Sequence, residues 1–405
     1  MFEGVLKRLN GFSQVFHLQG YVVYLVGGAV RNLLLGLPAK DFDFATDATP
    51  EEVSKLFRRV VPTGIKHGTV TVLFEQESYE VTTFRIDGAY KDHRHPGEVN
   101  YTRDLAADLG RRDFTINGMA LDLSSGVVVD LYGGKKDLKA GLIRAIGDPF
   151  QRFSEDALRI LRLFRFAAQY GFLVEEKTRK AAEQLSPNLA SVSRERIRDE
   201  FLKTIGARAS KEVWSDLQRC GILKLILTSE IVPDLSASAF TSWERLDPHQ
   251  RVSFWLAHGG VDSYQKFSVP LKLLKLSNNQ LKRVLMPLRA LPHLQADSND
   301  RRKAKLILFA WENRQYFSEA LKVLEALRED GLLKKQAISL TELRRAATSA
   351  EPVFLSELAV TGEELRAAGV LAGPLLGTLL RRLLELVWEE PLLNEKASLL
   401  KLIYH

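Results

Sequence analysis

The sequence has a single cysteine, Cys220, among 405 residues, and it lacks long hydrophobic runs. One thiol with no histidine beside it can form neither a disulfide framework nor a zinc site. No stretch reaches eighteen uncharged apolar residues, and the N-terminal MFEGVLKRLNGF has the pattern of an amphipathic helix rather than of a signal peptide. These absences predict a cytoplasmic protein that has no membrane span.

The charge of the chain is mildly positive. Lys and Arg number 57 against 50 Asp and Glu, which gives a formal net charge of +7 and a pI near 9.3. This balance favours a polyanionic partner without naming it. The composition is that of an ordinary globular protein, and 405 residues exceed the size at which one hydrophobic core usually keeps growing. Several domains are therefore expected.

The chain changes character near Pro149. Before it, strand-like runs alternate with short helical stretches, at residues 21–26, 69–75, 79–84 and 126–131. After it, apolar residues recur at helical spacing, most clearly at residues 158–172, 189–205 and 213–225. Breaker residues mark candidate joints at residues 147–149, 233–236, 287, 292–300 and 351–352. The pattern predicts an α+β head followed by an all-helical remainder.

A strand-like run enters a glycine turn and then a helix at Leu25-Val26-Gly27-Gly28-Ala29-Val30-Arg31. Glycines allow a phosphate to approach backbone N–H groups, and Arg31 adds a guanidinium. The segment therefore predicts a triphosphate cradle formed by Gly27, Gly28 and Arg31. Taken alone, such a turn is more often only a tight connection, so the prediction depends on the next motif.

The next motif, Lys40-Asp41-Phe42-Asp43-Phe44-Ala45, alternates acids with bulky apolar residues. A strand places Asp41 and Asp43 on one face and the two phenylalanines on the buried face. Two carboxylates ~7 Å apart repel each other unless a divalent cation lies between them, and Mg²⁺ prefers oxygen ligands. Isolated acids with this spacing are more often solvated on an edge strand, but the glycine turn ten residues upstream favours a Mg²⁺ site.

Two further segments offer candidate residues. Glu80 is a possible third carboxylate on a neighbouring strand, with a simple cross-strand ion pair as the alternative. In Arg111-Arg112-Asp113-Phe114-Thr115-Ile116-Asn117-Gly118, Arg112 can bind a phosphate and Asn117 can reach a sugar hydroxyl. The competing interpretation is a helix N-terminus stabilised by charge pairs.

One predicted helix carries polar side chains at every third position, namely Asp156, Arg159, Arg162 and Arg165. Side chains three residues apart are neighbours on a helix, so Asp156 and Arg159 can act as a pair. Cytosine and adenine both present an amino donor beside an unprotonated ring nitrogen, whereas uracil and guanine present a carbonyl beside a ring N–H. A carboxylate and a guanidinium together would therefore accept C and A and refuse U and G. The ordinary alternative is an exposed salt bridge.

In this order, the motifs resemble those of the class II tRNA nucleotidyltransferases, which include the CCA-adding enzymes and the bacterial poly(A) polymerases. The matching segments span roughly the first half of the chain: GGAVRN, KDFDFATDATPEEV, KHGTV, YEVTTFR, RRDFTINGMALD, EDALRILRLFRFAAQYGF and SVSRERIRDE. Near the C-terminus, Leu358-Ala359-Val360-Thr361-Gly362-Glu363-Glu364 and Asn394-Glu395-Lys396 resemble the tail of bacterial CCA-adding enzymes.

The resemblance implies a DNA polymerase β-like nucleotidyltransferase head with a mixed sheet, followed by a helical neck, body and tail. The implied boundaries are 1–146 for the catalytic head, 147–206 for a base-selecting neck, 207–315 for a tRNA-binding body and 316–405 for a tail that binds the tRNA elbow. It also implies that Asp41 and Asp43 bind Mg²⁺. The implied contacts of CTP or ATP are Gly28, Arg31, Arg112, Asp156, Arg159, Arg162 and Arg165.

Two positions depart from the family pattern. Asn32 stands where the family usually has Asp, which is expected to weaken the orientation of Arg31. Gly118 stands where Ala is commoner, and slightly greater backbone freedom is expected there. The segment between Phe84 and Arg111 looks like the full-length loop of CCA-adding members, whereas enzymes restricted to CC addition tend to have it shortened.

The sequence therefore predicts addition of C, C and A to the 3′ end of tRNA from CTP and ATP, with release of pyrophosphate, by two-metal in-line transfer. Alternatives are an A-adding or CC-adding enzyme, a bacterial poly(A) polymerase, and an inactive tRNA-binding protein on the same scaffold. Basic clusters at 266–275, 282–283 and 301–305 are candidate contacts for the tRNA acceptor arm and elbow, with solvated helix faces as the alternative.

Overall fold

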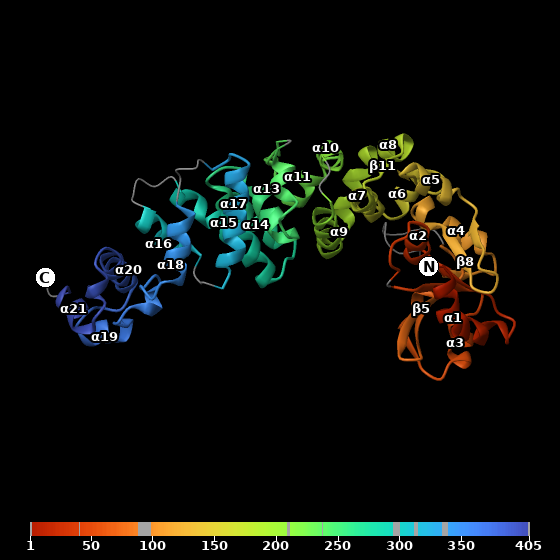
Figure 1. The fold of residues 1–405 in the computed structure, drawn as a ribbon, viewed down its shortest axis with the longest axis horizontal. Helices are drawn as coiled ribbons and strands as arrows, with labels where there is room; N and C mark the ends of the chain where they lie inside the picture. Colours follow the sequence, from red (N-terminus) through yellow and green to blue (C-terminus); the bar gives the residue numbers. More distant parts are fainter. Residues whose placement is uncertain are drawn as a thin grey trace. The chain divides into compact units, whose positions relative to one another are not determined.

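The computed structural model describes residues 2–39, 41–87, 99–208, 211–236, 238–294, 300–311, 315–333 and 339–403. The chain divides into two compact units, Met1–Leu225 and Ile226–His405, and the division falls within helix α11 (Ile222–Leu227). In Figure 1 the sheet of the first unit is coloured from red to yellow and its helical part from yellow to green. No helix among the described residues is both long and apolar enough to cross a membrane.

Within the described residues, the head contains a seven-stranded sheet in the order β3-β4-β5-β2-β1-β8-β9. The strands are β1 (Val23–Val26), β2 (Asp43–Thr46), β3 (Val60–Gly64), β4 (Thr69–Phe74), β5 (Glu77–Thr83), β8 (Met119–Asp122) and β9 (Val128–Asp130). The β2–β5 pair is parallel and the other pairs are antiparallel, which confirms the predicted mixed sheet. Two small sheets pair β6 (Arg85–Asp87) with β7 (Val99–Tyr101) and β10 (Leu142–Ile143) with β11 (Leu173–Val174).

The two faces of the sheet bury different sets of side chains. Helix α1 (Phe2–His17) covers one face, where Phe12 contacts the rings of Phe44 and Tyr79. On the other face, Val26 and Ala45 form a core with Leu109 of α4 (Leu105–Gly110). Because successive strand residues alternate between faces, Phe44 enters the first core while its neighbour Asp43 stays outside it.

The register of β1 and β2 brings the first two motifs together. Val26, the last residue of β1, pairs with Asp43, the first residue of β2. The glycine turn after Val26 therefore lies beside the acid that begins β2, where these two inner strands of the sheet meet at their ends. Helix α2 (Gly28–Leu34) follows that turn.

The remaining elements of the first unit are mainly helical. They are α3 (Pro50–Leu56), η1 (Ile65–His67), η2 (Thr115–Asn117), α5 (Gly134–Ala140), α6 (Pro149–Glu155), α7 (Leu158–Tyr170), α8 (Glu176–Leu185), η3 (Ser186–Ser191), α9 (Arg194–Gly206) and α10 (Lys211–Arg219). Helix α7 packs against α9 and α10. Two predicted helical stretches are interrupted: η3 ends at Ser191 before α9 begins, and Gly221, with φ of +67°, separates α10 from α11.

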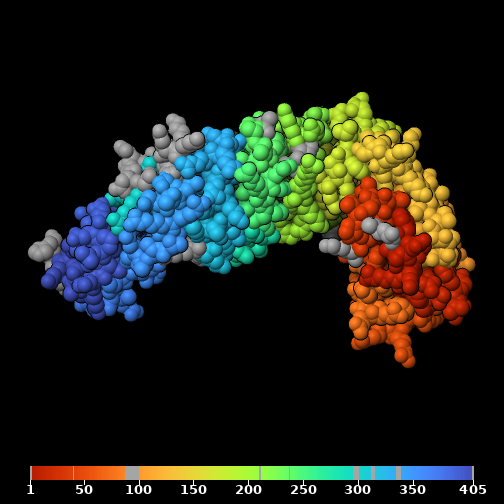
Figure 2. Space-filling model, in the orientation of Figure 1, coloured from red at the N-terminus to blue at the C-terminus, as the bar shows by residue number. Residues whose placement is uncertain are grey.

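The second unit is helical throughout its described residues. Its elements are α12 (Ala239–Trp243), α13 (Pro248–Ala257), α14 (Ser263–Leu273), α15 (Asn278–Leu294), α16 (Asp300–Ala310), α17 (Phe317–Glu329), α18 (Leu340–Thr348), η4 (Leu355–Glu357), α19 (Gly362–Ala367), α20 (Pro374–Glu389), η5 (Pro391–Leu393) and α21 (Lys396–Lys401). In Figure 2 its surface is coloured green, cyan and blue. Some of its helices pack against the next helix in sequence, as α15 does against α16, and others against the next but one, as α13 does against α15 and α16 against α18.

The candidate joint at Pro287 is wrong, because this proline lies inside α15. Pro292 also lies inside α15, but the predicted joint at 292–300 contains both the end of that helix at Leu294 and the start of α16 at Asp300. Proline removes a backbone donor and usually kinks or ends a helix. Here the surrounding side chains are buried, including Met286, Leu288 and Leu291. Tertiary packing therefore keeps the helix continuous where the local signal predicts a break.

Candidate active site

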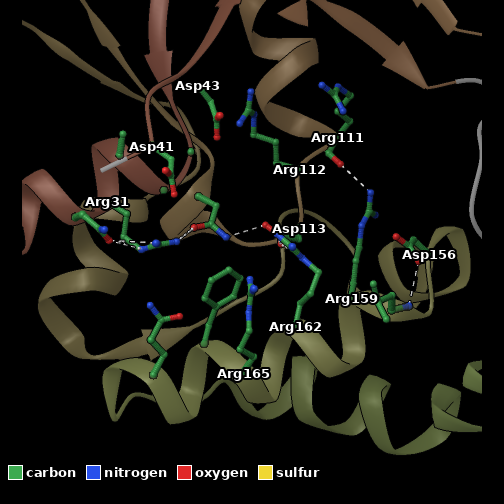
Figure 3. A pocket seen from close by; sticks show the side chains of 18 of the residues that line it. Arg31, Asp41, Asp43, Arg111, Arg112, Asp113, Asp156, Arg159, Arg162 and Arg165 are labelled. Carbon is green, nitrogen blue, oxygen red and sulfur yellow. Dashed lines mark hydrogen bonds and ion pairs between the residues drawn. The ribbon is translucent and has the colours of Figure 1, made fainter. Parts of the chain in front are cut away.

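A cavity of about 720 Å³ opens in the first unit between the glycine turn and α7 (Figure 3). Its walls bring together the predicted residues Gly27, Gly28, Arg31, Asp41, Asp43, Arg112, Asn117, Asp156, Arg159, Arg162 and Arg165. Arg111, Asp113, Phe166, Gln169 and Arg196 also line it and had no predicted role. The two carboxylates at one end can bind a cation, and the guanidiniums around them can bind an anion. The cavity therefore suits a polyanion that binds together with a cation.

Asp41 and Asp43 both face the cavity, as Figure 3 shows. Phe42 and Phe44 are buried, so the predicted alternation is confirmed, although β2 begins only at Asp43 and Asp41 precedes the strand. Desolvation and then the neighbouring charge of Glu80 raise the pKa of Asp43, while Arg112 acts against them. Burial and the nearby Glu80 therefore disfavour the charged form of Asp43 more than Arg112 favours it.

Glu80 lies next to Asp43 but outside the cavity wall. The parallel register pairs Asp43 with Glu80 on β5, and the Glu80 side chain is exposed. In the part of the chain that the structure describes, no three His, Cys, Asp or Glu side chains come close enough to hold a metal ion. A catalytic role for Glu80 therefore stays a prediction.

The two glycines of the turn leave space for two arginines. Gly27 has φ of +67°, a left-handed conformation that glycine adopts without strain. A Cβ atom on Gly27 would lie 3.4 Å from Nη1 of Arg112, and one on Gly28 would lie 3.3 Å from Nη2 of Arg31. Side chains at these positions would crowd both guanidiniums.

Arg31 is held by neutral partners. Its Nε and Nη2 donate to Oδ1 of Asn32 at 3.3 and 3.1 Å, and its Nη1 donates to Oδ1 of Asn117. Its guanidinium carbon lies 5.1 Å from the ring centre of Phe166 and 4.8 Å from that of Tyr170. Burial lowers the pKa of Arg31. Within the described residues the hydrogen bonds of Arg31 go to neutral amide oxygens, so its charge stays available for a phosphate, and Asn32 orients it in spite of the departure from the family pattern.

Asn117 connects Arg31 to Asp113. Its Nδ2 donates to Oδ1 of Asp113 at 2.9 Å, and Oδ2 of Asp113 accepts from Nε and Nη2 of Arg162 at 2.8 and 2.6 Å. Both ends of the Asn117 amide are thus engaged inside the protein, and the side chain is buried. These contacts support a positioning role for Asn117, which also lines the cavity, and its contact with a sugar hydroxyl stays a prediction. The chain Arg31–Asn117–Asp113–Arg162 links α2 to α7 (Figure 3).

The buried carboxylate of Asp113 is expected to stabilise the fold in a pH-dependent way. Burial raises its pKa, but Arg162 and the hydrogen bond from Asn117 outweigh burial and lower it from 3.8 to about 2. The ionised group therefore stabilises the fold fully above about pH 4, and this contribution is lost as the pH falls toward 2. We expect the free-energy difference of unfolding between wild type and Asp113→Asn to shrink by about 2 kcal/mol over that range, measured by chemical denaturation. Asp199→Asn on the exposed side of α9 is the control, and a pH-independent difference for Asp113 would contradict the assignment.

Asp108 holds the two arginines on the wall opposite α2. Its Oδ1 accepts from Nε and Nη2 of Arg111 at 3.0 and 2.8 Å, and its Oδ2 accepts from Nη2 of Arg112 at 3.0 Å. Although burial raises the pKa of Asp108, the two guanidiniums lower it below the ordinary value. Sequence reasoning missed this residue, although its spacing of three and four residues from the arginines was a usable signal.

The predicted continuous helix through residues 154–165 is wrong at Asp156. Helix α6 ends at Glu155 and α7 begins at Leu158, because the backbone of Asp156 is extended, with φ of −140° and ψ of 102°. Oδ1 of Asp156 accepts from the backbone N of Leu158 at 3.1 Å. Oδ2 of Asp156 accepts from Nη2 of Arg196 at 3.0 Å. Asp156 is therefore held from both α7 and α9.

Arg159 pairs with Glu155 at 2.8 Å and donates to the backbone oxygens of Arg152 and Arg111 at 3.0 and 3.1 Å. Asp156 forms its ion pair with Arg196 of α9 at 3.0 Å. Asp156 and Arg159 nevertheless both line the cavity at the start of α7. Further along α7, Arg165 forms an ion pair with Glu200 of α9 at 3.2 Å.

Family models match three parts of the chain. The model described as the poly A polymerase head domain matches residues 23–144. A model described as the probable RNA and SrmB-binding site of polymerase A matches residues 171–237, and one described as tRNA nucleotidyltransferase domain 2, putative, matches residues 255–403. The matches thus cover the sheet-containing head and most of the helical remainder.

Similar proteins extend over nearly the whole chain. The CCA-adding enzyme of Leuconostoc mesenteroides is 35% identical over 395 residues, which is 94% of this chain and 92% of the relative. That of Enterococcus faecalis is 49% identical over 201 residues, 50% of this chain and 48% of the relative. The crystal structure of the Bacillus stearothermophilus CCA-adding enzyme in complex with CTP is 31% identical, covers 96% of this chain and 93% of its own, and has a TM-score of 0.68.

Proposed function

The chain belongs to the family of CCA-adding enzymes, and from that premise we propose that it adds C, C and A to the 3′ end of tRNA, using CTP and ATP and releasing pyrophosphate. The observation that carries the proposal is the single cavity that joins two acids, a group of arginines and the start of α7. Each part of a nucleotidyl transfer has residues suited to it within that cavity.

The triphosphate would bind between the glycine turn and the arginines. Arg31, whose hydrogen-bonded partners are neutral, and Arg112, held by Asp108, supply charge. Gly27 and Gly28, which have no side chains, leave the backbone accessible on the same side of the cavity. These groups would neutralise the phosphates and hold the α-phosphate in front of the tRNA 3′-hydroxyl for in-line attack.

Enzymes of this family use divalent metal ions, and we propose Mg²⁺ bound by Asp41 and Asp43. The donor set fits, because both acids supply only oxygen, the ligand atom that Mg²⁺ prefers. Bound Mg²⁺ would favour ionisation of the 3′-hydroxyl and offset charge on the departing pyrophosphate. The protein residues fix where the two reacting groups meet.

The base would be selected at the start of α7. A carboxylate only accepts hydrogen bonds and a guanidinium only donates them, so Asp156 and Arg159 match the edge that cytosine and adenine share. Contacts from the Leu158 backbone and Arg196 orient Asp156, and Glu155 orients Arg159. These supports would keep the selecting groups in one orientation for both nucleotides.

We propose the division into head (1–146), neck (147–206), body (207–315) and tail (316–405), with body and tail binding the tRNA acceptor arm and elbow. The family model that matches residues 23–144 supports the extent of the head, whereas the matches at 171–237 and 255–403 each extend across a proposed boundary. A cytoplasmic location is part of the proposal, supported by a single cysteine that is buried and unpaired with another thiol.

The test is incorporation of labelled CMP and AMP into tRNA that lacks its 3′ end, resolved one nucleotide at a time. Two C additions followed by one A addition are expected. CC-only, A-only or poly(A) products would identify the corresponding partial activity, and absence of incorporation with retained tRNA binding would identify an inactive binding protein. The loop predicted to favour full CCA addition lies partly outside the described residues, at 88–98, so the assay decides this point.

The basic clusters of the second unit are not equivalent. Arg301 and Lys305 form ion pairs with Glu351 at 2.8 and 2.7 Å, and Arg302 pairs with Glu385 and Glu389. Lys272 and Lys282 are exposed on α14 and α15. The lysines are therefore the better candidates for phosphate contacts.

Replacing Lys272 and Lys282 with glutamate is expected to weaken tRNA binding and to reduce the slope of log affinity against log salt by about 1 for each lysine. Arg302→Glu is the matched charge reversal and should change that slope less. Filter binding over a salt series measures both. Equal slopes for the wild type and the double lysine variant would contradict the assignment.

A further inference from the structure

Tyr170, the last residue of α7, joins that helix to α2. Its hydroxyl donates to Oδ1 of Asn32 at 3.2 Å, across 138 positions of sequence. The same oxygen accepts from Nε and Nη2 of Arg31. The Asn32 amide nitrogen donates to the backbone oxygen of Pro38 at 3.3 Å, which fixes the direction of the amide. One amide oxygen thus connects a phosphate-binding arginine to the end of α7.

The ring of Tyr170 makes a second connection to Arg31. Tyr170 and Phe166 lie one turn apart on α7, with ring centres 6.3 Å apart and an interplanar angle of 20°. The Arg31 guanidinium lies over both rings, at 4.8 Å from Tyr170 and 5.1 Å from Phe166. A buried guanidinium over aromatic faces is attracted to them, so a shift of α7 would move the surface on which Arg31 rests.

The position of Tyr170 is set by the end of the helix. Gly171 follows with φ of +66° and closes α7 as a left-handed cap. The other link between α2 and α7, through Asn117 and Asp113, reaches the helix at Arg162, nearer its start. Two separated points of attachment resist rotation of α7 about either one, whereas a single point would not.

Given the proposed function, we propose that Tyr170 is a positioning residue that couples the triphosphate end of the cavity to its base-selecting end. A triphosphate bound to Arg31 holds the guanidinium on the two rings, and the rings hold α7. The first turn of that helix carries Arg159, eleven residues from Tyr170 and therefore about 16 Å along the axis. A contact at one end of the nucleotide would thereby set the geometry at the other.

Tyr170→Phe tests the coupling, because it removes the hydroxyl and keeps the ring. Dissociation constants for inorganic tripolyphosphate, CTP and UTP are measured by calorimetry in the presence of Mg²⁺. We expect affinity for tripolyphosphate to fall about two- to tenfold, as for loss of one neutral hydrogen bond, and the preference for CTP over UTP to fall about threefold. Tyr170→Leu, which also removes the ring, should weaken tripolyphosphate binding further.

Tyr132→Phe is the matched control. Its hydroxyl donates to the backbone oxygen of Ala106 at 2.9 Å within the same unit, and Tyr132 does not line the cavity. This variant should bind all three ligands as wild type does. Loss of one phenolic hydrogen bond at an unrelated position therefore serves as the baseline for Tyr170→Phe.

Two results would overturn the coupling. One is unchanged tripolyphosphate affinity in Tyr170→Phe; the other is weaker tripolyphosphate binding with an unchanged preference for CTP over UTP. Thermal unfolding shows whether each variant is folded, and Tyr170→Phe carries the test if Tyr170→Leu is not. The binding measurements contain no tRNA, so failure of the wild type to extend tRNA would refute the proposed function and leave this test intact.

Discussion

Replacing Asp43 with asparagine is expected to lower CMP incorporation into tRNA about a thousandfold or more and to leave tRNA affinity unchanged. The substitution keeps the size of the side chain and removes one of the two carboxylates proposed to bind Mg²⁺ in the cavity. Metal-assisted stabilisation of a reacting phosphate contributes several kcal/mol, and each 1.4 kcal/mol corresponds to about tenfold in rate. Single-turnover incorporation of labelled CMP, with tRNA affinity measured separately, tests the expectation.

Two substitutions on β5 serve as comparisons for Asp43→Asn. Glu77→Gln removes an exposed carboxylate that pairs with Arg8 at 2.6 Å, far from the cavity wall, and should leave incorporation unchanged. Glu80→Gln is expected to cost less than Asp43→Asn, because Glu80 acts on Asp43 by its charge and does not line the cavity. An equal loss of incorporation in Glu80→Gln and Asp43→Asn would identify Glu80 as a third metal ligand. Incorporation by Asp43→Asn within tenfold of wild type would refute the metal assignment.

Replacing Asp156 with asparagine is expected to reduce the preference for CTP over UTP about ten- to hundredfold. A carboxylate can only accept from the cytosine amino group, whereas an amide NH₂ can also donate to the uracil carbonyl. A hydrogen bond to a charged group contributes about 1.5–3 kcal/mol, which sets the size of the change. The measurement is kcat/KM for each nucleotide on tRNA lacking its 3′ end.

The variant should remain folded, because asparagine retains an oxygen that can accept from the Leu158 backbone as Asp156 does. Asp148→Asn is the matched control: it makes the same change at the start of α6, where Asp148 pairs with Lys177 at 3.1 Å outside the cavity wall. Its nucleotide preference should equal that of wild type. An unaltered CTP-to-UTP ratio in Asp156→Asn would argue against base selection by this carboxylate.

Features that depend on neighbouring residues were predictable from the sequence. The alternation around Asp41 and Asp43 follows from the period of a strand, and the structure buries Phe42 and Phe44 as expected. A sheet-containing head and a helical remainder follow from the change in hydrophobic period near Pro149, whereas the mixed sheet was implied by the family resemblance. The cavity contains every predicted site residue other than Glu80. The first two motifs meet there because the β1–β2 register places them side by side.

Breaks within helical patterns were less predictable. Helical periodicity runs through Asp156, but the backbone of Asp156 is extended and separates α6 from α7, which the spacing of apolar residues does not reveal. Pro287 predicts a joint and lies within α15, because buried neighbours outweigh the cost of the lost donor. Gly118, expected to give extra freedom, instead leaves space that Ile146 fills, since a Cβ atom there would lie 2.5 Å from Cδ1 of Ile146.

By itself the sequence determined the residue types of the site and their order, because acids, glycines and arginines carry their chemistry wherever the chain places them. Only the tertiary structure decided which of them meet. Arg31 reaches Asn117 across 86 positions, Asp113 reaches Arg162 across 49, and Tyr170 reaches Asn32 across 138. Hydrogen bonds act over about 3 Å of space regardless of separation in sequence, and folding alone brings such partners within that distance.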